Sequence, residues 1–238
     1  MHSPVLETIH RRRAIRAFVP AKIAPELRDQ LLAAACAAPS SLNLQPYRIY
    51  YIDTPPVRAE VARLCMGQAA ATTASALVVV VADIGSWKAT HRARVARMRE
   101  LGVDPDRIGR HERKMKVFGP LLFRPGWLSL LGYFKNAVFR LVNLWKVMGI
   151  PAGTRAQLFA WAARNSTLAC QNLMIAAEAC GLASCPMEGF DGIRLARFLG
   201  LSQRTQRVVL VVALGKRSET FKLEPQWRRP LADTVTYL

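Results

Sequence analysis

The sequence has 238 residues, of which 51% are hydrophobic, so the chain is long and apolar enough to form one folded domain, and a disordered protein is excluded. Its 34 basic and 16 acidic residues give a formal net charge of +18. Such a charge favours anionic partners, whether a phosphate-bearing cofactor, an acidic membrane surface or nucleic acid, and does not choose among them.

Five segments carry clear patterns of secondary structure. Pro25–Ala38 is predicted as a helix from leucines at helical spacing, and Tyr47–Ile52 as a strand from its aromatic and β-branched residues. Leu77–Ala82 and Arg207–Leu214 are apolar runs typical of buried strands, and Arg155–Cys180 is predicted as a long helix ended by a glycine. The elements mix without a regular βαβ alternation, which indicates an α+β fold.

Residues 88–150 differ from the rest of the chain. Lys88–Lys116 contains ten basic and four acidic residues, which gives a net charge of +6. Between residues 126 and 148, apolar residues and polar residues fall on different faces at helical spacing, which predicts an amphipathic helix. We therefore expect a single domain over residues 1–238, with a basic insertion at 88–150 that forms a lid or contacts a partner or a membrane.

The cysteines, the N-terminus and the histidines carry no signal of export or of a metal site. The five cysteines are irregularly spaced and form no C-x-x-C pair, so we expect reduced thiols that fill apolar space in a cytoplasmic protein. The first 18 residues lack the apolar region of a secretory signal, and polar residues interrupt the long apolar stretch Trp127–Met148, so no membrane span is predicted. The four histidines lack metal-ligand spacing.

An arginine cluster lies near the N-terminus, where Arg12, Arg13 and Arg16 stand close together after Arg11. Guanidinium groups bind phosphate oxygens bidentately and keep their charge, so the cluster predicts a phosphate site. A solvated basic face is the alternative.

Two loops between predicted elements offer further ligand groups. Ala37–Tyr47 presents the hydroxyl of Ser40 and the amides of Asn43 and Gln45, which match the donors and acceptors at the edge of a heterocycle. Cys185–Gly192, read as a loop after the long helix, contains proline and glycine and exposes backbone N–H groups to a ligand. The alternatives are an ordinary polar loop and a plain turn between helices.

Together and in this order, the three motifs resemble the nitroreductase flavoprotein family, whose pattern has an arginine-rich start, Pro-Ser-x-x-Asn-x-Gln-Pro before a strand and Pro-x-Glu-Gly-Phe-Asp after a long helix. The resemblance covers roughly residues 5–85 and 155–238. It implies a central, mostly antiparallel sheet flanked by helices, in a homodimer with flavin sites between the subunits. Two departures are Ala14, where the family often has serine, and the insertion at 88–150, which replaces the family's lid region.

The resemblance also implies the cofactor-binding residues. It assigns the phosphate and ribityl chain of FMN to arginines from both ends of the chain: Arg12, Arg13, Arg16 and either Arg228 or Arg229. It assigns further contacts, some of them from the neighbouring subunit, to polar residues of the first loop: Ser40, Asn43 and Gln45. It assigns the isoalloxazine ring to the last motif, with the Glu188 amide near N5, and to one residue beside it: Pro186, Met187, Glu188, Gly189 and Gln68.

The activity implied is FMN-dependent oxidoreduction by a ping-pong mechanism, in which NADH or NADPH reduces the flavin and a nitroaromatic, quinone or related small-molecule oxidant then takes its place. No side-chain acid or base is required, because the cofactor carries the chemistry. Two alternatives stay open: a flavin-binding or redox-sensing protein without significant turnover, and a reductive dehalogenase or flavin-fragmenting enzyme of the same fold.

Charge alone suggests a third class of function. The sequence contains no nucleic-acid recognition motif, so no specific nucleic-acid partner is expected. Peripheral contact of residues 126–148 with an anionic membrane stays a hypothesis, because tryptophans lie on the apolar side of that segment and its charges are basic.

Overall fold

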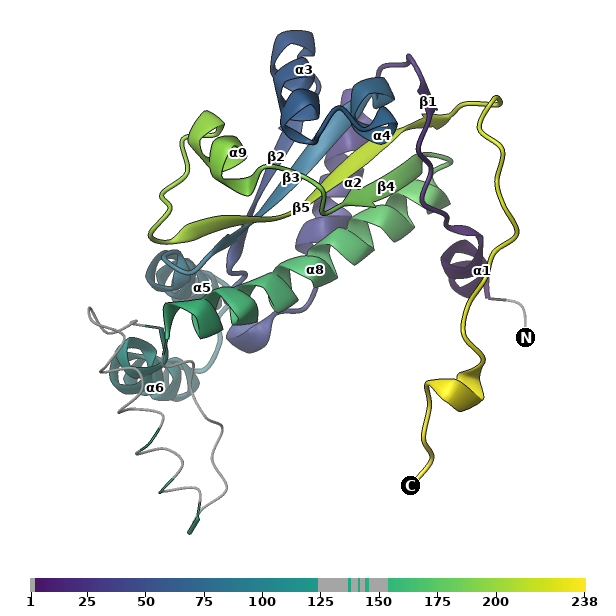
Figure 1. Ribbon diagram of the computed structural model, residues 1–238. Helices are drawn as coiled ribbons and strands as arrows, with labels where there is room; N and C mark the ends of the chain where they lie inside the picture. Colours follow the sequence, from purple (N-terminus) through teal and green to yellow (C-terminus); the bar gives the residue numbers. More distant parts are fainter. Residues whose placement is uncertain (1–2, 124–136, 138–140, 142–143, 146–153) are drawn as a thin grey trace.

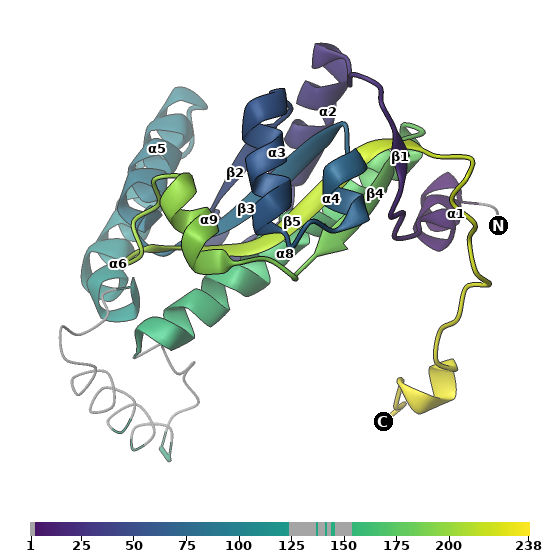
Figure 2. The same ribbon diagram turned by 45° about the horizontal axis from the view of Figure 1, so that its top comes forward.

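A computed structural model describes residues 3–123, 137, 141, 144–145 and 154–238, in which five strands form one sheet with helices on both faces (Figures 1 and 2). The strands are β1 (Phe18–Val19), β2 (Tyr47–Ile52), β3 (Ala76–Asp83), β4 (Ala183–Met187) and β5 (Gln206–Arg217). The α-helices are α1 (Pro4–Arg11), α2 (Pro25–Cys36), α3 (Pro55–Leu64), α4 (Ala69–Thr73), α5 (Trp87–Glu100), α6 (Pro105–Phe123), α8 (Arg155–Ala179) and α9 (Gly192–Phe198). Two 3₁₀ turns, η1 (Ser41–Asn43) and η2 (Leu231–Asp233), complete the described elements.

The sheet has the order β1-β5-β3-β2, and β4 also pairs with β5. All four strand pairings are antiparallel, which confirms the predicted α+β fold with a central antiparallel sheet. The predicted strand Tyr47–Ile52 matches β2 at both ends. The two apolar runs lie within β3 and β5, which extend beyond them because each is paired over its whole length.

Strand β3 shows how one sequence supports two layers. All eight of its residues are buried, and successive side chains point to opposite faces. Leu77, Val79 and Val81 pack with α3, α4 and α9, whereas Val78 and Val80 pack with α2 and α8. The figures show these two helical layers on either side of the sheet.

The first half of the basic insertion is a helical hairpin, α5–α6, that packs against the start of α8. The Trp87 and Phe123 rings lie 5.4 Å apart between centroids, and Phe123 lies 5.1 Å from the Trp161 ring. The amphipathic helix predicted at 126–148 lies outside the described residues, apart from positions 137, 141, 144 and 145. Among the described helices, none has the length and hydropathy needed to cross a bilayer.

Two expectations from the sequence are wrong. Cys185–Met187 is not loop but the end of β4, because these residues pair with Val211–Ala213 of β5, and a proline is tolerated in a strand whose other side lacks a full partner. The loop therefore begins at Glu188. The cysteines are also not all apolar fillers, since Cys36 and Cys180 are exposed while the other three are buried.

Candidate functional site

A cavity of about 310 Å³ opens at the sheet edge formed by β4. It is bounded by the N-terminal arginine segment, the turn before α4 and the end of β4: Ala14, Arg16, Gln68, Ala69, Ala70, Cys185, Pro186 and Met187. The arginine segment reaches this edge because Ala14 forms a bridge with Ser184, and the Ile15 amide donates to the Ser184 carbonyl at 3.0 Å. The fold thus brings together two motifs that lie about 170 residues apart in the sequence.

Two arginines lie at or near the cavity. Arg16 lines it, and Arg12, which is not part of the lining, has its Nη1 buried with no hydrogen-bond partner among the described residues. Burial raises the pKa of the Cys185 thiol, which lines the cavity, while the charges of Arg16 and Arg12 act in the opposite direction because both guanidinium groups lie near this thiol. An unpartnered buried cationic nitrogen is costly, so this end of the cavity is suited to an anion such as a phosphate.

Gln68 ties the loop after β4 to the floor of the cavity. Its Nε2 donates to the Gly189 carbonyl at 2.7 Å and to the Cys65 carbonyl at 3.0 Å. A Cβ at Gly189 would lie 3.0 Å from Gln68 Nε2, so glycine permits this close approach. Glu188 is exposed and stands between Met187, which lines the cavity, and Gly189, whose carbonyl is held by Gln68.

The polar loop lies at the opposite edge of the sheet. Ser40, Asn43 and Gln45 precede β2, which is separated from β4 by β5 and β3, or three strand spacings of about 14 Å in total. The loop is compact, since Ser40 Oγ accepts from the Gln45 amide at 3.0 Å and Gln45 Nε2 donates to Asn43 Oδ1 at 3.2 Å. Within one chain, the structure therefore does not bring these three residues to the arginine cavity.

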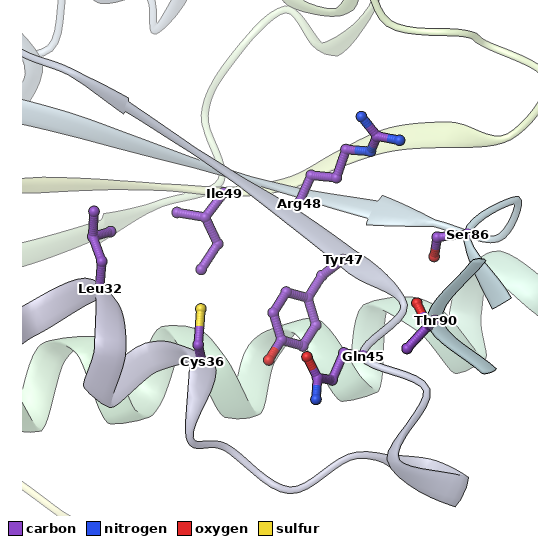
Figure 3. A pocket seen from close by; sticks show the side chains of 8 residues that line it. All are labelled: Leu32, Cys36, Gln45, Tyr47, Arg48, Ile49, Ser86 and Thr90. Carbon is purple, nitrogen blue, oxygen red and sulfur yellow. The ribbon is translucent and has the colours of Figure 1, made fainter. Parts of the chain in front are cut away.

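A second cavity, of about 410 Å³, lies beside this polar loop between α2, β2 and α5 (Figure 3). Figure 3 shows the Tyr47 ring between Cys36 and the Gln45 amide. The Tyr47 hydroxyl is buried without a hydrogen-bond partner among the described residues, and burial raises its pKa.

The C-terminal segment approaches the N-terminal arginines without entering the cavity. Arg13 Nη2 donates to the Glu224 carbonyl at 2.7 Å, and the segment then passes α1 and runs away from the sheet (Figure 1). Arg228 and Arg229 are exposed and donate locally, Arg228 to the Trp227 carbonyl at 2.7 Å and Arg229 to the Asp233 carbonyl at 3.1 Å. Thus Arg16, Gln68, Pro186 and Met187 line one cavity, with Arg12 and Gly189 near lining residues, whereas the two C-terminal arginines stand apart.

Sequence reasoning missed several residues that shape these sites. Ala69 and Ala70 line the first cavity, and Asn165 accepts a hydrogen bond from the Ser41 amide at 2.7 Å. An alanine side chain has no polar group that would indicate a binding site. A single asparagine in a helical pattern also gives little indication of its role, because its partner Ser41 lies 124 residues away in the sequence. Cys185 stands inside a motif that the sequence singled out, yet a cysteine without a partner motif gives no sign that it borders a cationic cavity.

Comparisons with known proteins bear on the family and the fold of the chain. The model of the family described as "Nitroreductase family" matches residues 9–216. Protein DrgA of Synechocystis is 29% identical over 214 residues, covering 90% of this chain and 84% of the relative, and a protein of Thermus thermophilus named NADH dehydrogenase is 28% identical over 227 residues, covering 95% and 92%. A solved structure titled "putative nitroreductase in complex with FMN" from Exiguobacterium sibiricum superposes with a TM-score of 0.75 at 23% identity, covering 100% and 98%.

Proposed function

The chain belongs to the nitroreductase family, and on this premise we propose that it is an FMN-dependent oxidoreductase that takes electrons from NADH or NADPH and passes them to a small electrophilic acceptor. The observation that carries the proposal is the cavity at β4, where Arg16 meets Pro186, Met187 and Gln68, with the unpartnered Nη1 of Arg12 buried near the lining residue Cys185. A phosphate at one end and a flat, largely uncharged ring at the other match this lining.

In this proposal the residues of the cavity bind and orient. Arg12 and Arg16 hold the phosphate of FMN, because charge-assisted hydrogen bonds from guanidinium groups are strong and directional. Gln68 fixes the Gly189 carbonyl and thereby the backbone at Glu188, which the family resemblance sets against the reactive edge of the ring. Bound FMN supplies hydride acceptance and donation, so the protein needs no side-chain acid or base of its own.

We also propose a homodimer, in which Ser40, Asn43 and Gln45 serve the cavity of the second copy. These residues lie across the sheet from the cavity of their own chain. The chain carries apolar surface that a second copy would cover: Val5, Leu6 and Ile9 on α1, and Trp227, Leu231, Tyr237 and Leu238 in the C-terminal segment. Exposed apolar groups gathered in this way are typical of protein interfaces.

Three finer points belong to the same proposal. The acceptor would be a nitroaromatic, a quinone or a related oxidant that replaces the nicotinamide over the flavin. Arg228 or Arg229 would meet the phosphate once the C-terminal segment is ordered by FMN or by the second copy. The cell compartment would be the cytoplasm, in keeping with five thiols that form no disulfide.

The test is the visible absorption spectrum of the purified protein, followed by anaerobic titration with NADH and NADPH. We expect bound FMN that either nucleotide bleaches. An Arg12→Met, Arg16→Met double variant should lose FMN affinity by at least about tenfold, because a hydrogen bond to a charged group contributes about 1.5–3 kcal/mol. Arg204→Met is the control, since Arg204 is an exposed cation before β5 that does not line the cavity.

The alternatives give different results. A protein that takes up no FMN and oxidises neither nucleotide would refute the proposal. Bound FMN with negligible steady-state turnover against nitroaromatic and quinone acceptors would favour a flavin-binding or redox-sensing protein instead.

A further inference from the structure

The turn that carries Asn43 and Gln45 has an unusual backbone. Leu42, Asn43 and Gln45 have φ values of 56°, 52° and 44°, which is the left-handed region that side-chain-bearing residues rarely adopt. Three such residues within four positions persist only where surrounding structure enforces the conformation.

The bonds inside the turn hold its parts to one another. The Asn43 amide donates to the Ser40 carbonyl at 2.8 Å, and the Gln45 amide donates to Ser40 Oγ at 3.0 Å. These contacts fix Asn43 relative to Gln45. They do not fix the turn relative to the sheet. The buried Leu44 side chain anchors the turn in the apolar core, but apolar packing does not set the orientation of the backbone polar groups.

Two side chains outside the turn supply that direction. Asn165 of α8 is only 5% exposed, and its Oδ1 accepts from the Ser41 amide at 2.7 Å while its Nδ2 donates to the Trp161 carbonyl at 2.7 Å. The second bond sets which end of the amide faces Ser41. Arg94 of α5 donates from Nη1 to the Leu42 carbonyl at 2.6 Å. The two bonds thus hold the Ser40–Ser41 and Leu42–Asn43 peptide groups, which lie on either side of the Ser41–Leu42 peptide at the start of the left-handed stretch.

We propose that Arg94 and Asn165 are positioning residues for flavin binding, which act by holding the Ser41–Leu42 backbone so that Asn43 and Gln45 face the cofactor. This inference rests on the proposed function. It gives the basic insertion a role in the site, because Arg94 belongs to α5 and reaches a loop 52 residues earlier in the chain. Thr90 of α5 borders the same loop across the second cavity (Figure 3).

The test compares Arg94→Met, Arg94→Lys, Asn165→Leu and the control Arg92→Met, an exposed cation on the same helix. Hydrogen–deuterium exchange over residues 40–46 measures the turn without any cofactor. Affinities for FMN and for riboflavin, measured by flavin fluorescence, separate the two ends of the ligand. Thermal melting identifies any variant that fails to fold, and Arg94→Met on the partly exposed hairpin keeps the test valid if Asn165→Leu does not fold.

We expect faster exchange over the turn in Arg94→Met and Asn165→Leu, with both affinities lowered by the same factor, on the order of five- to tenfold. Arg94→Lys should restore much of the loss, because an ammonium also donates to a carbonyl, and Arg92→Met should resemble the parent. The Arg12→Met, Arg16→Met variant should instead lose more affinity for FMN than for riboflavin, since it removes phosphate contacts.

Unchanged exchange in a folded Arg94→Met variant, or no rescue by Arg94→Lys, would overturn the positioning role. Faster exchange with unchanged flavin affinity would overturn its link to the cofactor. If the parent protein binds no flavin, the proposed function fails and the link to the cofactor fails with it, while the exchange result still decides whether Arg94 and Asn165 hold the turn.

Discussion

The five cysteines lie in two kinds of environment, although none has a disulfide partner. Cys36 and Cys180 are exposed, whereas burial raises the pKa of Cys65 to about 11 and that of Cys170 to about 12. Burial also raises the pKa of Cys185. Because the thiolate is the reactive form, the buried thiols should be protected by both access and protonation.

We therefore expect two fast thiols and three slow ones when the native protein is titrated with a thiol-reactive disulfide reagent at pH 8. Unfolding in denaturant should make all five react. Cys36→Ser should remove one fast equivalent and leave the slow phase unchanged. Three or more fast thiols in the native protein would show that one of the buried positions is open.

A histidine pair lies between α5 and α6. The His91 and His111 rings lie 5.0 Å apart between centroids, and His91 Nδ1 and His111 Nε2 are buried without partners among the described residues. Burial is the main cause that lowers the pKa of each imidazole, and the charge of Arg94 lowers both pKa values further. His91 and Lys114 also lower the pKa of His111, whereas the charge of Glu112 raises the pKa of both histidines.

The sign of the pH effect follows from these lowered values. Between the folded-state pKa and the ordinary value of 6.5, the unfolded chain binds more protons than the folded one. The stability that the fold has with both histidines neutral is therefore fully present above pH 6.5 and is lost as the pH falls through the folded-state pKa values. We expect the free energy of unfolding in urea to drop less between pH 7.5 and pH 5 in a His91→Asn, His111→Gln variant than in the parent. His10→Gln, at an exposed position, should leave the parent's pH dependence intact.

At the scale of elements, α8 begins with a complete capping box. Thr154 Oγ1 accepts from the Gln157 amide at 3.2 Å, and Gln157 Oε1 accepts from the Thr154 amide at 3.0 Å. Thr154→Ala should lower the free energy of unfolding by about 1 kcal/mol, because it leaves an N-terminal amide without its partner. Thr167→Ala, at an exposed position within the same helix, is the control and should change stability by less than about 0.5 kcal/mol. Equal losses in the two variants would show that the cap contributes nothing specific.

The elements that sequence predicts well are those whose pattern is local. β2 is bounded by Pro46 and Asp53 and was predicted at both ends, and the glycine after α8 has the positive φ of 74° that such a stop requires. β1 and β4 were missed for the opposite reason. Each is defined by its pairing with β5, while small residues and Pro186 give β4 no strand pattern of its own.

The candidate site divides in the same way. The three motifs predicted a site that includes the arginine segment and Pro186–Gly189, and the resemblance added Gln68; of these residues, the fold places Arg16, Gln68, Pro186 and Met187 at one cavity. The position of the Ser40–Gln45 loop across the sheet follows from strand order, which no local pattern encodes. Arg94 and Asn165 were missed because each contacts the loop through backbone groups, which leave no trace in the sequence of the loop.

At the scale of the whole molecule, the separation of the two half-sites predicts complementation between subunits. An Arg12→Met, Arg16→Met chain lacks the phosphate contacts, and an Asn43→Ala, Gln45→Ala chain lacks the polar groups at the opposite edge. If each flavin site takes one set from each subunit, a mixed dimer has one intact site and one doubly defective site. We expect mixed dimers, purified with two affinity tags, to bind FMN with parental affinity at half of their sites. Two weak sites in every mixed dimer would place both sets in the site of a single chain.

The net charge of +18 leads to a last prediction, on the surface of the α5–α6 hairpin. Nine of its cations are exposed: Lys88, Arg92, Arg97, Arg99, Arg107, Arg110, Arg113, Lys114 and Lys116. Within the part of the chain that the structure describes, only Arg97 and Arg99 among these nine form an ion pair, with Glu100 and Glu112 respectively. Surface basic residues contribute about 1 kcal/mol each to association with an anionic bilayer, and the contribution falls as salt is added.

We expect the protein to co-sediment with vesicles that contain phosphatidylserine, more weakly as the salt concentration rises, and not with neutral phosphatidylcholine vesicles. Arg107→Gln, Arg110→Gln and Lys114→Gln together remove three charges from one face of α6 and should weaken this association strongly. Arg197→Gln, Lys222→Gln and Arg204→Gln remove the same charge from exposed positions outside the hairpin and should weaken it far less. Equal losses in the two triple variants would mean that binding depends on net charge alone. Pelleting with neutral vesicles would indicate an apolar contact rather than an electrostatic one, because neutral lipid has no surface charge to attract the hairpin.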